Sequence, residues 1–569
     1  MTLDNRTGIA LSILLIIITT FIAFSPSLKN GFVYWDDYEY IVANSSIKQL
    51  SIENIKTIFG SSYVSNYQPL SILTYALEYS FFKLNPEPYH ATNILIHILN
   101  CLLVFWIFML ISGRISISLV TALFFGLHPL RVESVAWAAE RKDVLYAFFF
   151  LASGVSYLYY IRKNQLRYYY SSFLLFFLSV LSKAMAVTLP VIFFLIDYLL
   201  QRKPCKKIFV EKIPFFILSL IFGYAAIVIQ NETGAVSNLN FSSVLYRVQI
   251  AFLGLISYLN KMLFPVNLSA AYPYPDQNLS FQALTTVSFL TIIVLGCIVF
   301  FSTRFTRKMV FGSLFFLLTI LPVLQIIPVG YFFMADRYTY VPSIGLAYIF
   351  SEGLFWLYHK KYEYENISKR LQIIVLSIFI LLLAFLTYQR NKLWKDDFVL
   401  WNNTLKNYPQ AYSVYIFLGQ AYNEKGDFEK AIECFNKSTG ARILKPINDM
   451  VSKAYINAGY SYFKKEDFDR AIDNYNKAID IKPNGAEAYY NRGNAYFYKK
   501  DFDSAISDYN TAIQLMPDNT DIYNNRANVY IAKQEYDKAW QDVHKIESLG
   551  GSPTPALLEE LKKVSGQEE

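Results

Sequence analysis

The chain has 569 residues, of which 54% are hydrophobic and 17% charged, and its formal net charge is +8. It is too apolar for an ordinary soluble protein and too charged for a bare membrane bundle. The two kinds of sequence are separated, because apolar blocks recur up to about Arg390 and then stop. We therefore expect an all-α protein in which a helical membrane bundle precedes a soluble part.

A helix that crosses a bilayer needs about 20 mostly apolar residues. Several blocks approach that length: Ile9–Phe24, Leu95–Ile111, Val144–Ile161, Phe173–Leu189, Phe215–Ile229, Leu284–Phe301, Phe311–Ile327 and Ile373–Leu386. No small-residue cleavage site precedes Asn30, so we expect the first block to be a retained helix rather than a signal peptide.

Basic loops indicate the orientation of the bundle, because short cytoplasmic loops are rich in Lys and Arg. These loops contain Arg162, Lys163, Arg167, Arg202, Lys203, Lys206, Lys207, Lys212, Arg304, Arg307, Lys308, Lys360, Lys361, Lys369 and Arg370. Residues 30–88 then form a long outer loop. Segment 247–264 has polar ends and ends before Pro265, so we expect it to lie in the membrane interface. This gives eleven spans, with the C-terminal part outside; counting that segment gives twelve and breaks the charge rule at two loops.

A 34-residue period follows the last apolar block, in Ser452–Gly485, Ala486–Asn519 and Thr520–Pro553. Small residues, tyrosines and prolines recur in fixed columns, such as Gly459, Gly493 and Ala527. The columns resemble the tetratricopeptide repeat, whose helical hairpins stack into an α-solenoid. We divide the chain into a membrane domain (1–390), a linker with a degenerate half repeat (391–411), repeats (412–451, 452–485, 486–519, 520–553) and a capping helix with a tail (554–569).

Such arrays bind peptides or partner proteins. Asparagines on the first helices of successive units are candidates to hold an extended peptide, because each amide offers a donor and an acceptor. We predict that they bind the acceptor, although they are equally typical of solvated polar positions; they are Asn491, Asn494, Asn525 and Asn528.

Charged residues gather on the outer side of the predicted bundle, where charges at the membrane edge indicate a functional site. Asp36 and Asp37 open the first outer loop, and the segment His128–Asp143 and residues Asp336 and Arg337 lie at the ends of later spans. Together with Lys183, this pattern of carboxylates beside cations suits a reaction on an anionic, lipid-linked substrate.

The pattern resembles membrane glycosyltransferases of the C fold, and more closely the transmembrane and tetratricopeptide repeat-containing protein O-mannosyltransferases. Asp36-Asp37 stands where that family has its acidic pair, His128–Asp143 is similar to its second-loop segment, and Arg337–Gly345 carries its Y-x-P-S-x-G stretch. The chain departs from the family in its shorter repeat array and in Lys183, which has no acidic neighbour in sequence. These departures leave the donor sugar and the acceptor open.

The resemblance implies an inverting transferase that uses a polyprenyl-phosphate sugar, for which mannose is one candidate, and a Ser or Thr hydroxyl of a protein recruited by the repeats. Asp36 is then the general base, with Asp37 orienting the acceptor or tuning its neighbour. Arg141, Lys183 and Arg337 are candidates to bind the donor phosphate. The supporting residues are His128, Arg131, Glu133 and Asp143. We expect no cofactor; His128 and Glu133 alone are weak evidence for a divalent metal.

Other interpretations stay open. The acidic pair is also typical of a loop beside an aromatic belt. Arg141 and Asp143 are also typical of an anchor at the membrane interface. Arg337 and Asp336 could equally form an internal ion pair. The alternative function is a non-catalytic membrane scaffold that assembles partner proteins. We expect no nucleic-acid partner, since the basic residues sit in loops between spans. Few repeats and no eukaryotic retention signal at Gly566–Glu569 favour a bacterial inner membrane with a periplasmic active site.

Overall fold

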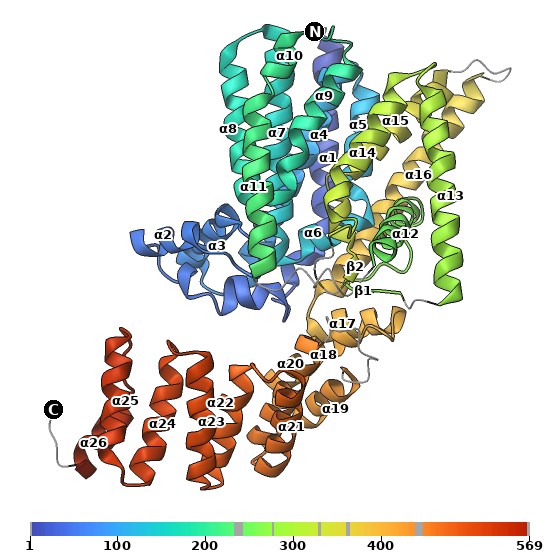
Figure 1. Cartoon of the computed structure of the whole chain (residues 1–569). Helices are drawn as coiled ribbons and strands as arrows, with labels where there is room; N and C mark the ends of the chain where they lie inside the picture. Colours follow the sequence, from blue (N-terminus) through green and yellow to red (C-terminus); the bar gives the residue numbers. More distant parts are fainter. Residues whose placement is uncertain are drawn as a thin grey trace. The chain divides into compact units, whose positions relative to one another are not determined.

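The computed structural model describes residues 3–565 apart from 233–242, 276–277, 328–329, 331, 360–364 and 439–447. It divides into a membrane unit, Met1–Pro409, and a repeat unit, Gln410–Glu569. Regular structure is almost entirely helical, which confirms the all-α class (Figure 1). Lys360, Lys361, residues 439–447 of the first predicted repeat and the tail 566–569 lie outside the described residues.

The membrane unit contains seventeen labelled α-helices within the described ranges. They are α1 (Leu3–Phe24), α2 (Ile52–Gly60), α3 (Pro69–Phe82), α4 (Pro86–Ser112), α5 (Ile115–Leu127), α6 (Val132–Ala136), α7 (Arg141–Lys163), α8 (Leu166–Ser182), α9 (Leu189–Leu199), α10 (Lys206–Val210), α11 (Ile213–Glu232), α12 (Val244–Leu263), α13 (Leu279–Ser302), α14 (Arg307–Ile320), α15 (Ser343–His359), α16 (Glu365–Asn391) and α17 (Asp397–Asn407).

Six stretches of the described chain are long and apolar enough to cross a membrane, and they contain α1, α4, α7, α11, α13 and α16. The bent pair of α5 and Pro129–Ala136 makes a seventh if it is one span. The shorter helices α8, α9, α14 and α15 stand at the other predicted spans. The total of eleven spans is thus supported by length and composition for six or seven helices, and for the rest it stays a prediction. Segment α12 does not meet the same criteria and is strongly foreshortened in Figure 1, where α13 runs along the bundle.

Two breaks in the helices place charged residues at one end of the bundle. Pro129 has no N–H and restricts His128 to an extended conformation (ψ 133°), so α5 ends there and the chain bends by 56°. Lys183 is also extended (φ −161°, ψ 134°) and separates α8 from the turn that leads into α9. Site residues therefore lie on short, irregular connections that rigid helices hold in place.

The two ends of the bundle differ in charge. At the end far from the N-terminus, α6 lies near a small antiparallel sheet of β1 (Tyr272–Pro273) and β2 (Phe332–Met334), in which Tyr272 pairs with Met334 (Figure 1). The basic loops meet at the other end, where Arg307 donates to the carbonyl of Tyr198 (3.1 Å) and Lys207 to Asn164 (3.3 Å). This segregation agrees with the charge rule that gave the predicted orientation.

The repeat unit is a series of helical hairpins. Its helices are α18 (Tyr412–Glu424), α19 (Phe428–Ser438), α20 (Asn448–Lys464), α21 (Phe468–Ile481), α22 (Ala486–Tyr498), α23 (Phe502–Leu515), α24 (Thr520–Ala532), α25 (Tyr536–Ser548) and α26 (Pro555–Ser565). The last helix buries Leu557 and Leu561 against Trp540 and Val543 and so covers the end of the array.

Glycine is required where the two helices of a hairpin cross. A Cβ added at Gly459 would lie 2.6 Å from the Tyr475 ring, and one at Gly493 would lie 2.9 Å from the Tyr509 ring. The last hairpin has Ala527 in this column, and the position equivalent to Tyr509 is the smaller Val543. In these hairpins the crossing is therefore filled either by glycine with a tyrosine ring or by alanine with valine.

We expect Gly493→Ala to destabilise the repeat unit by about 1–2 kcal/mol, because overpacking outweighs the helix propensity that alanine gains. Combining it with Tyr509→Val recreates the pair of the last hairpin, so the double variant should cost less than the sum of the single variants by about 1 kcal/mol. Urea unfolding of residues 410–569 measures all three free energies. Additive costs would contradict the proposed crossing constraint.

Candidate active site

The two neighbouring aspartates of the first outer loop have different surroundings. Asp37 is buried; its carboxylate accepts from the backbone N–H of Val33 (2.9 Å) and of Ala139 (2.6 Å). Asp36 keeps 16% of its side chain exposed and accepts from the ammonium of Lys142 through Oδ2 at 3.0 Å. Asp37 thus attaches the loop to the start of α7, while Asp36 faces a group of charges.

The carboxylate of Glu140 lies at the centre of that group. It is 3.1 Å from the ammonium of Lys142, 3.7 Å from that of Lys183 and 3.3 Å from Nε of Arg337. Its side chain is only 1% exposed. A buried carboxylate needs such partners, because its desolvation costs several kcal/mol.

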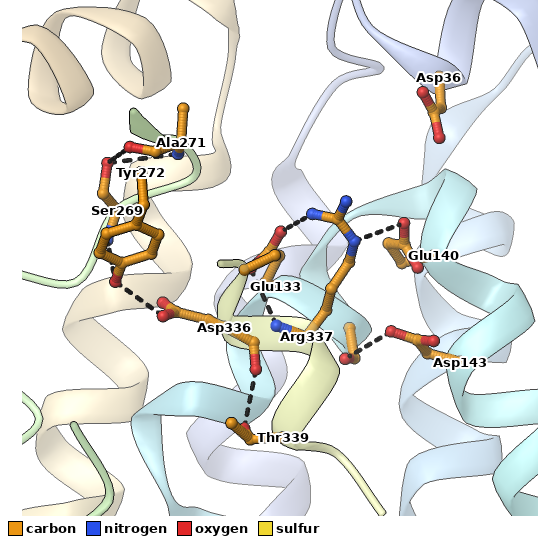
Figure 2. Close-up of polar contacts among 12 residues, drawn as sticks. Asp36, Glu133, Glu140, Asp143, Ser269, Ala271, Tyr272, Asp336, Arg337 and Thr339 are labelled. Carbon is orange, nitrogen blue, oxygen red and sulfur yellow. Dashed lines mark hydrogen bonds and ion pairs between the residues drawn. The ribbon is translucent and has the colours of Figure 1, made fainter. Parts of the chain in front are cut away.

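Three more carboxylates complete what we call the ion cluster. Glu133 pairs with the Arg337 guanidinium and also accepts from the Arg337 backbone N–H (3.0 Å). Asp143 pairs with Lys183. Figure 2 shows the Arg337 guanidinium between the carboxylates of Glu133 and Glu140. With Asp36, the cluster consists of Asp36, Glu133, Glu140, Lys142, Asp143, Lys183 and Arg337.

The members of the ion cluster differ in exposure: some are fully buried and others are accessible to a substrate. The side chains of Glu133, Glu140 and Asp143 are at most 1% exposed, whereas Asp36, Lys183 and Arg337 retain 14–16%. The reachable groups are therefore one carboxylate and two cations. This combination can accept a proton and hold an anion side by side.

Aromatic side chains surround the guanidinium of Arg337. Its central carbon lies 5.6 Å from the Trp35 ring centre, 5.5 Å from Trp137 and 5.0 Å from Tyr338. Trp35 and Trp137 stack on each other with centres 4.3 Å apart. Aromatic faces attract a cation, so the rings hold Arg337 beside the loop that carries Asp36.

Arg141 lies outside the ion cluster. Its side chain is fully buried, and it donates to Asn93 (2.9 Å), to the carbonyl of Tyr89 (2.7 Å) and to Glu78 (2.5 Å). These contacts join α7 to α3 and α4, so they occupy the guanidinium within the protein. The predicted anchor pair of Arg141 with Asp143 does not form, because Asp143 pairs with Lys183.

The predicted supporting residues divide in the same way. His128 contacts the carbonyl of Met262 (3.1 Å), and Arg131 donates to Thr339 (2.7 Å), so both connect the chain bend to other elements. Glu133 and Asp143 belong to the ion cluster. Asp336 pairs with Arg390 (2.8 Å) and accepts from Tyr272 (2.7 Å); the alternative pair of Asp336 with Arg337 is not present.

Within the described ranges, no group of three or more His, Cys, Asp and Glu residues is placed to hold a metal ion.

In the repeat unit, two of the four predicted asparagines contact each other. Asn525 donates to Asn494 (2.9 Å) and to the hydroxyl of Tyr490 (2.8 Å), and Asn494 also accepts from Tyr509 (2.6 Å). Asn491 and Asn528 lie three residues away on the same helices, α22 and α24. The asparagines are thus half-buried positions between successive hairpins, and their role in binding stays a prediction.

Comparisons with known proteins agree with both units. Residues 412–442 and 486–519 match the tetratricopeptide repeat, and residues 459–500 match a TPR repeat. The protein O-mannosyl-transferase TMTC3 of Mus musculus is 24% identical over 463 residues, which cover 73% of this chain and 49% of that protein. Protein O-mannosyl-transferase F38B6.6 of Caenorhabditis elegans is 26% identical over 441 residues, covering 73% and 60%. The chain is thus similar to these protein O-mannosyl-transferases over 73% of its length.

The predicted family resemblance is therefore confirmed. The chain spans about half the length of the curated relatives it matches, with 49% of TMTC3 and 60% of the worm protein covered. Human TMTC1 is 31% identical over a shorter stretch of 146 residues, or 24% of this chain and 16% of that one. Among solved structures, the crystal structure of MamA covers 30% of this chain and 88% of its own at 24% identity, with a TM-score of 0.23.

The sequence analysis assigned no role to two members of the ion cluster. Glu140 and Lys142 stand in the run Glu140-Arg-Lys-Asp143, at the start of α7. Residues three apart share a helix face, so the spacing of Glu140 and Asp143 was a usable signal for paired carboxylates. Lys183 lacks an acidic neighbour in sequence, and the fold supplies Asp143 and Glu140 instead.

Burial raises the pKa of Asp37 to about 8, although the Val33 and Ala139 N–H groups lower it; the nearby charges of Asp36 and Asp397 raise it further. An unfolded aspartate titrates at a pKa of about 4. Between these values the folded protein holds a proton that the unfolded chain lacks. Stability should therefore fall as the pH rises through this window and level off above it.

We expect Asp37→Asn to remove this part of the pH dependence, since asparagine does not titrate and keeps one acceptor oxygen. The measurement is the midpoint of thermal unfolding in detergent across the range from about pH 5 to about pH 9, for the wild type and the variant. The wild-type midpoint should fall more steeply with pH. Parallel curves would show that Asp37 is ionised in the folded protein.

Proposed function

We propose that the membrane unit is a glycosyltransferase that moves a sugar from a polyprenyl-phosphate donor to a hydroxyl group of a protein. The carrying observation is the reachable part of the ion cluster, where Asp36 stands beside Lys183 and Arg337. The relatives' names, protein O-mannosyl-transferases, support mannose as the sugar and protein hydroxyls as acceptors.

Asp36 has the surroundings of a general base. Lys142 occupies one carboxylate oxygen, and among the described residues the other has no hydrogen-bond donor. A free carboxylate oxygen can take the proton of an acceptor hydroxyl as that hydroxyl attacks the sugar, an effect worth about 10²–10⁴ in rate. The new bond joins the hydroxyl oxygen to the anomeric carbon, and the bond from that carbon to the phosphate oxygen breaks.

The leaving group is then an anionic lipid phosphate, and Lys183 and Arg337 are the cations that can receive it. Arg337 presents a planar set of donors suited to phosphate, and Lys183 adds a compact charge. Arg141, which the sequence offered as a third candidate, uses its donors inside the fold. The phosphate should therefore bind between the break after α8 and the turn Asp336–Thr339.

Lys183 also offers a route for the lipid. It lines a small cavity with Gln68 on one side and with Phe222, Ala225 and Gln230 of α11 on the other. α11 is an apolar span with large exposed side chains such as Leu220 and Ile221. A polyprenyl chain can therefore lie along α11 in the hydrocarbon region while its phosphate reaches Lys183. We place this end of the bundle on the outer side, the periplasmic side if the source is bacterial.

We expect Asp36→Asn to reduce sugar transfer by at least about a hundredfold, because the amide keeps the shape of the side chain and loses the basic oxygen. The matched control is Glu39→Gln, which removes the same charge from an exposed position three residues along the same loop. Transfer from a polyprenyl-phosphate sugar to a peptide is measured in reconstituted vesicles. A rate within about tenfold of the wild type would exclude Asp36 as the base. The scaffold function would be favoured only if the wild-type protein itself transferred no sugar.

We propose further that the repeats recruit the protein acceptor and take no part in the transfer step. Removing residues 410–569 should leave the rate on a short peptide within a few-fold of the wild type. The rate on a dilute protein acceptor should fall strongly, because tethering provides effective concentrations up to the millimolar range. The comparison of both acceptors with both proteins is the measurement. An equal loss on the two acceptors would contradict recruitment and indicate that the repeats support the membrane unit.

A further inference from the structure

The segment that follows the last predicted span is joined to the first outer loop by hydrogen bonds. The side chain of Asn391 accepts from Ser27 (2.6 Å) and donates to the carbonyl of Ala23 (3.2 Å). The N–H of Gly31 donates to the carbonyl of Lys395 (2.9 Å). Contacts of this kind continue along both segments. Residues 391–397 therefore lie beside residues 23–34, although more than 350 positions separate them in the sequence.

Asp397 contacts the acidic loop two residues before Asp36. Its Oδ1 accepts from the backbone N–H of Tyr34 at 2.6 Å and from the indole N–H of Trp401 at 3.2 Å. One carboxylate therefore connects the loop backbone to the first turn of α17. Hydrogen bonds to a charged acceptor are stronger than those between neutral groups.

Tryptophans extend the same junction. The Trp35 ring packs edge-on against Trp401, with ring centres 5.3 Å apart, and stacks on Trp137 at 4.3 Å. Trp137 stacks in turn on Trp394 at 5.5 Å. Four of the seven tryptophans of the chain are in this group, and Trp394 and Trp401 are almost completely buried.

These contacts hold the acidic loop on both sides of Asp36. Tyr34 and Trp35, which precede it, are held by Asp397 and Trp401, and Asp37, which follows it, is held by the N–H of Ala139. The direction of the Asp36 carboxylate is then set by a segment that the sequence indicated as a linker. A misplacement of about 1 Å can cost about a hundredfold in rate.

We propose that Asp397 and Trp401 are positioning residues for Asp36, and that through these two side chains the first turns of α17 act on the reaction of the membrane unit. The inference rests on the proposed function, because it takes Asp36 as the base. Asp397 itself touches no substrate in this account; it acts on the reaction through the backbone of Tyr34.

The test uses the full chain with substitutions at two neighbouring aspartates of α17. Asp397→Ala removes the acceptor for Tyr34, and Asp397→Asn keeps an oxygen at that place. Asp396→Ala is the control: Asp396 caps the same helix by accepting from the N–H of Val399 (2.9 Å), and within the described part of the chain its side chain makes no hydrogen bond to residues 30–37. Hydrogen exchange of residues 30–37 reports the loop directly, and kcat and KM for donor and acceptor report the reaction.

Asp397→Ala should speed exchange in residues 30–37 and lower kcat by about tenfold to a hundredfold, with the KM for the donor little changed. Asp397→Asn should recover most of both, and Asp396→Ala should resemble the wild type in both. Wild-type exchange or wild-type kcat in Asp397→Ala would overturn the proposal, as would equal effects of Asp396→Ala. The two proposals fail separately, because Asp36→Asn alone tests the base, and the exchange data test the attachment of the loop whatever reaction the protein catalyses.

Discussion

The carboxylate of Glu140 is buried at the start of α7, and three cations from three places in the chain turn toward it: Lys142, Lys183 and Arg337. A buried charge is stable only when opposite charges pair with it, so the ion pairs of this carboxylate fix the break after α8 and the turn before α15 against the same helix end. The same cations also pair with Asp36, Asp143 and Glu133. The result is a group of charges whose most buried members are carboxylates. Its partly exposed members are the carboxylate of Asp36 and two cations, Lys183 and Arg337, of the kinds that bind phosphate.

A second ionic group at the opposite end of the bundle shows what a purely structural arrangement looks like. There Asp197 and Glu211 pair with Arg202 and Lys212, two charges of each sign, and the hydroxyl oxygen of Tyr157 lies 3.0 Å from each carboxylate. Every member is occupied, and the group joins the ends of α7, α9 and α10. The ion cluster differs because one oxygen of Asp36 has no hydrogen-bond donor in the described part of the chain, and because Lys183 lines a cavity beside α11. That difference, more than the number of charges, separates a candidate active site from a clamp between helices.

Much of this architecture can be read from the sequence where the signal is local. The 34-residue period predicted the hairpins, and the columns of Gly459 and Gly493 predicted where their helices cross. Asp36, Lys183 and Arg337 were found as charges at the outer ends of predicted spans, and the family resemblance supported Asp36 and Arg337. The rest depends on packing between distant segments. Asp37 bonds to Ala139, about a hundred residues away, and nothing in the pair Asp36-Asp37 says which of the two faces the cations. Arg141 is an equally plausible phosphate ligand in sequence, and only the fold shows that its guanidinium contacts Asn93, Glu78 and Tyr89. Asp397 and Trp401 carry no local signal at all, because their partners are at the other end of the membrane unit.

The proposed function requires that the reachable face of the ion cluster binds a lipid phosphate. The sharpest test is a structure of the full chain in lipid nanodiscs with an added polyprenyl phosphate. We expect phosphate oxygens within hydrogen-bond distance of Lys183 and Arg337, with Asp36 on the side where the sugar would be attached and the prenyl chain along α11. A phosphate held by Arg141, or one held by Arg202 and Lys212 at the opposite end of the bundle, would contradict it.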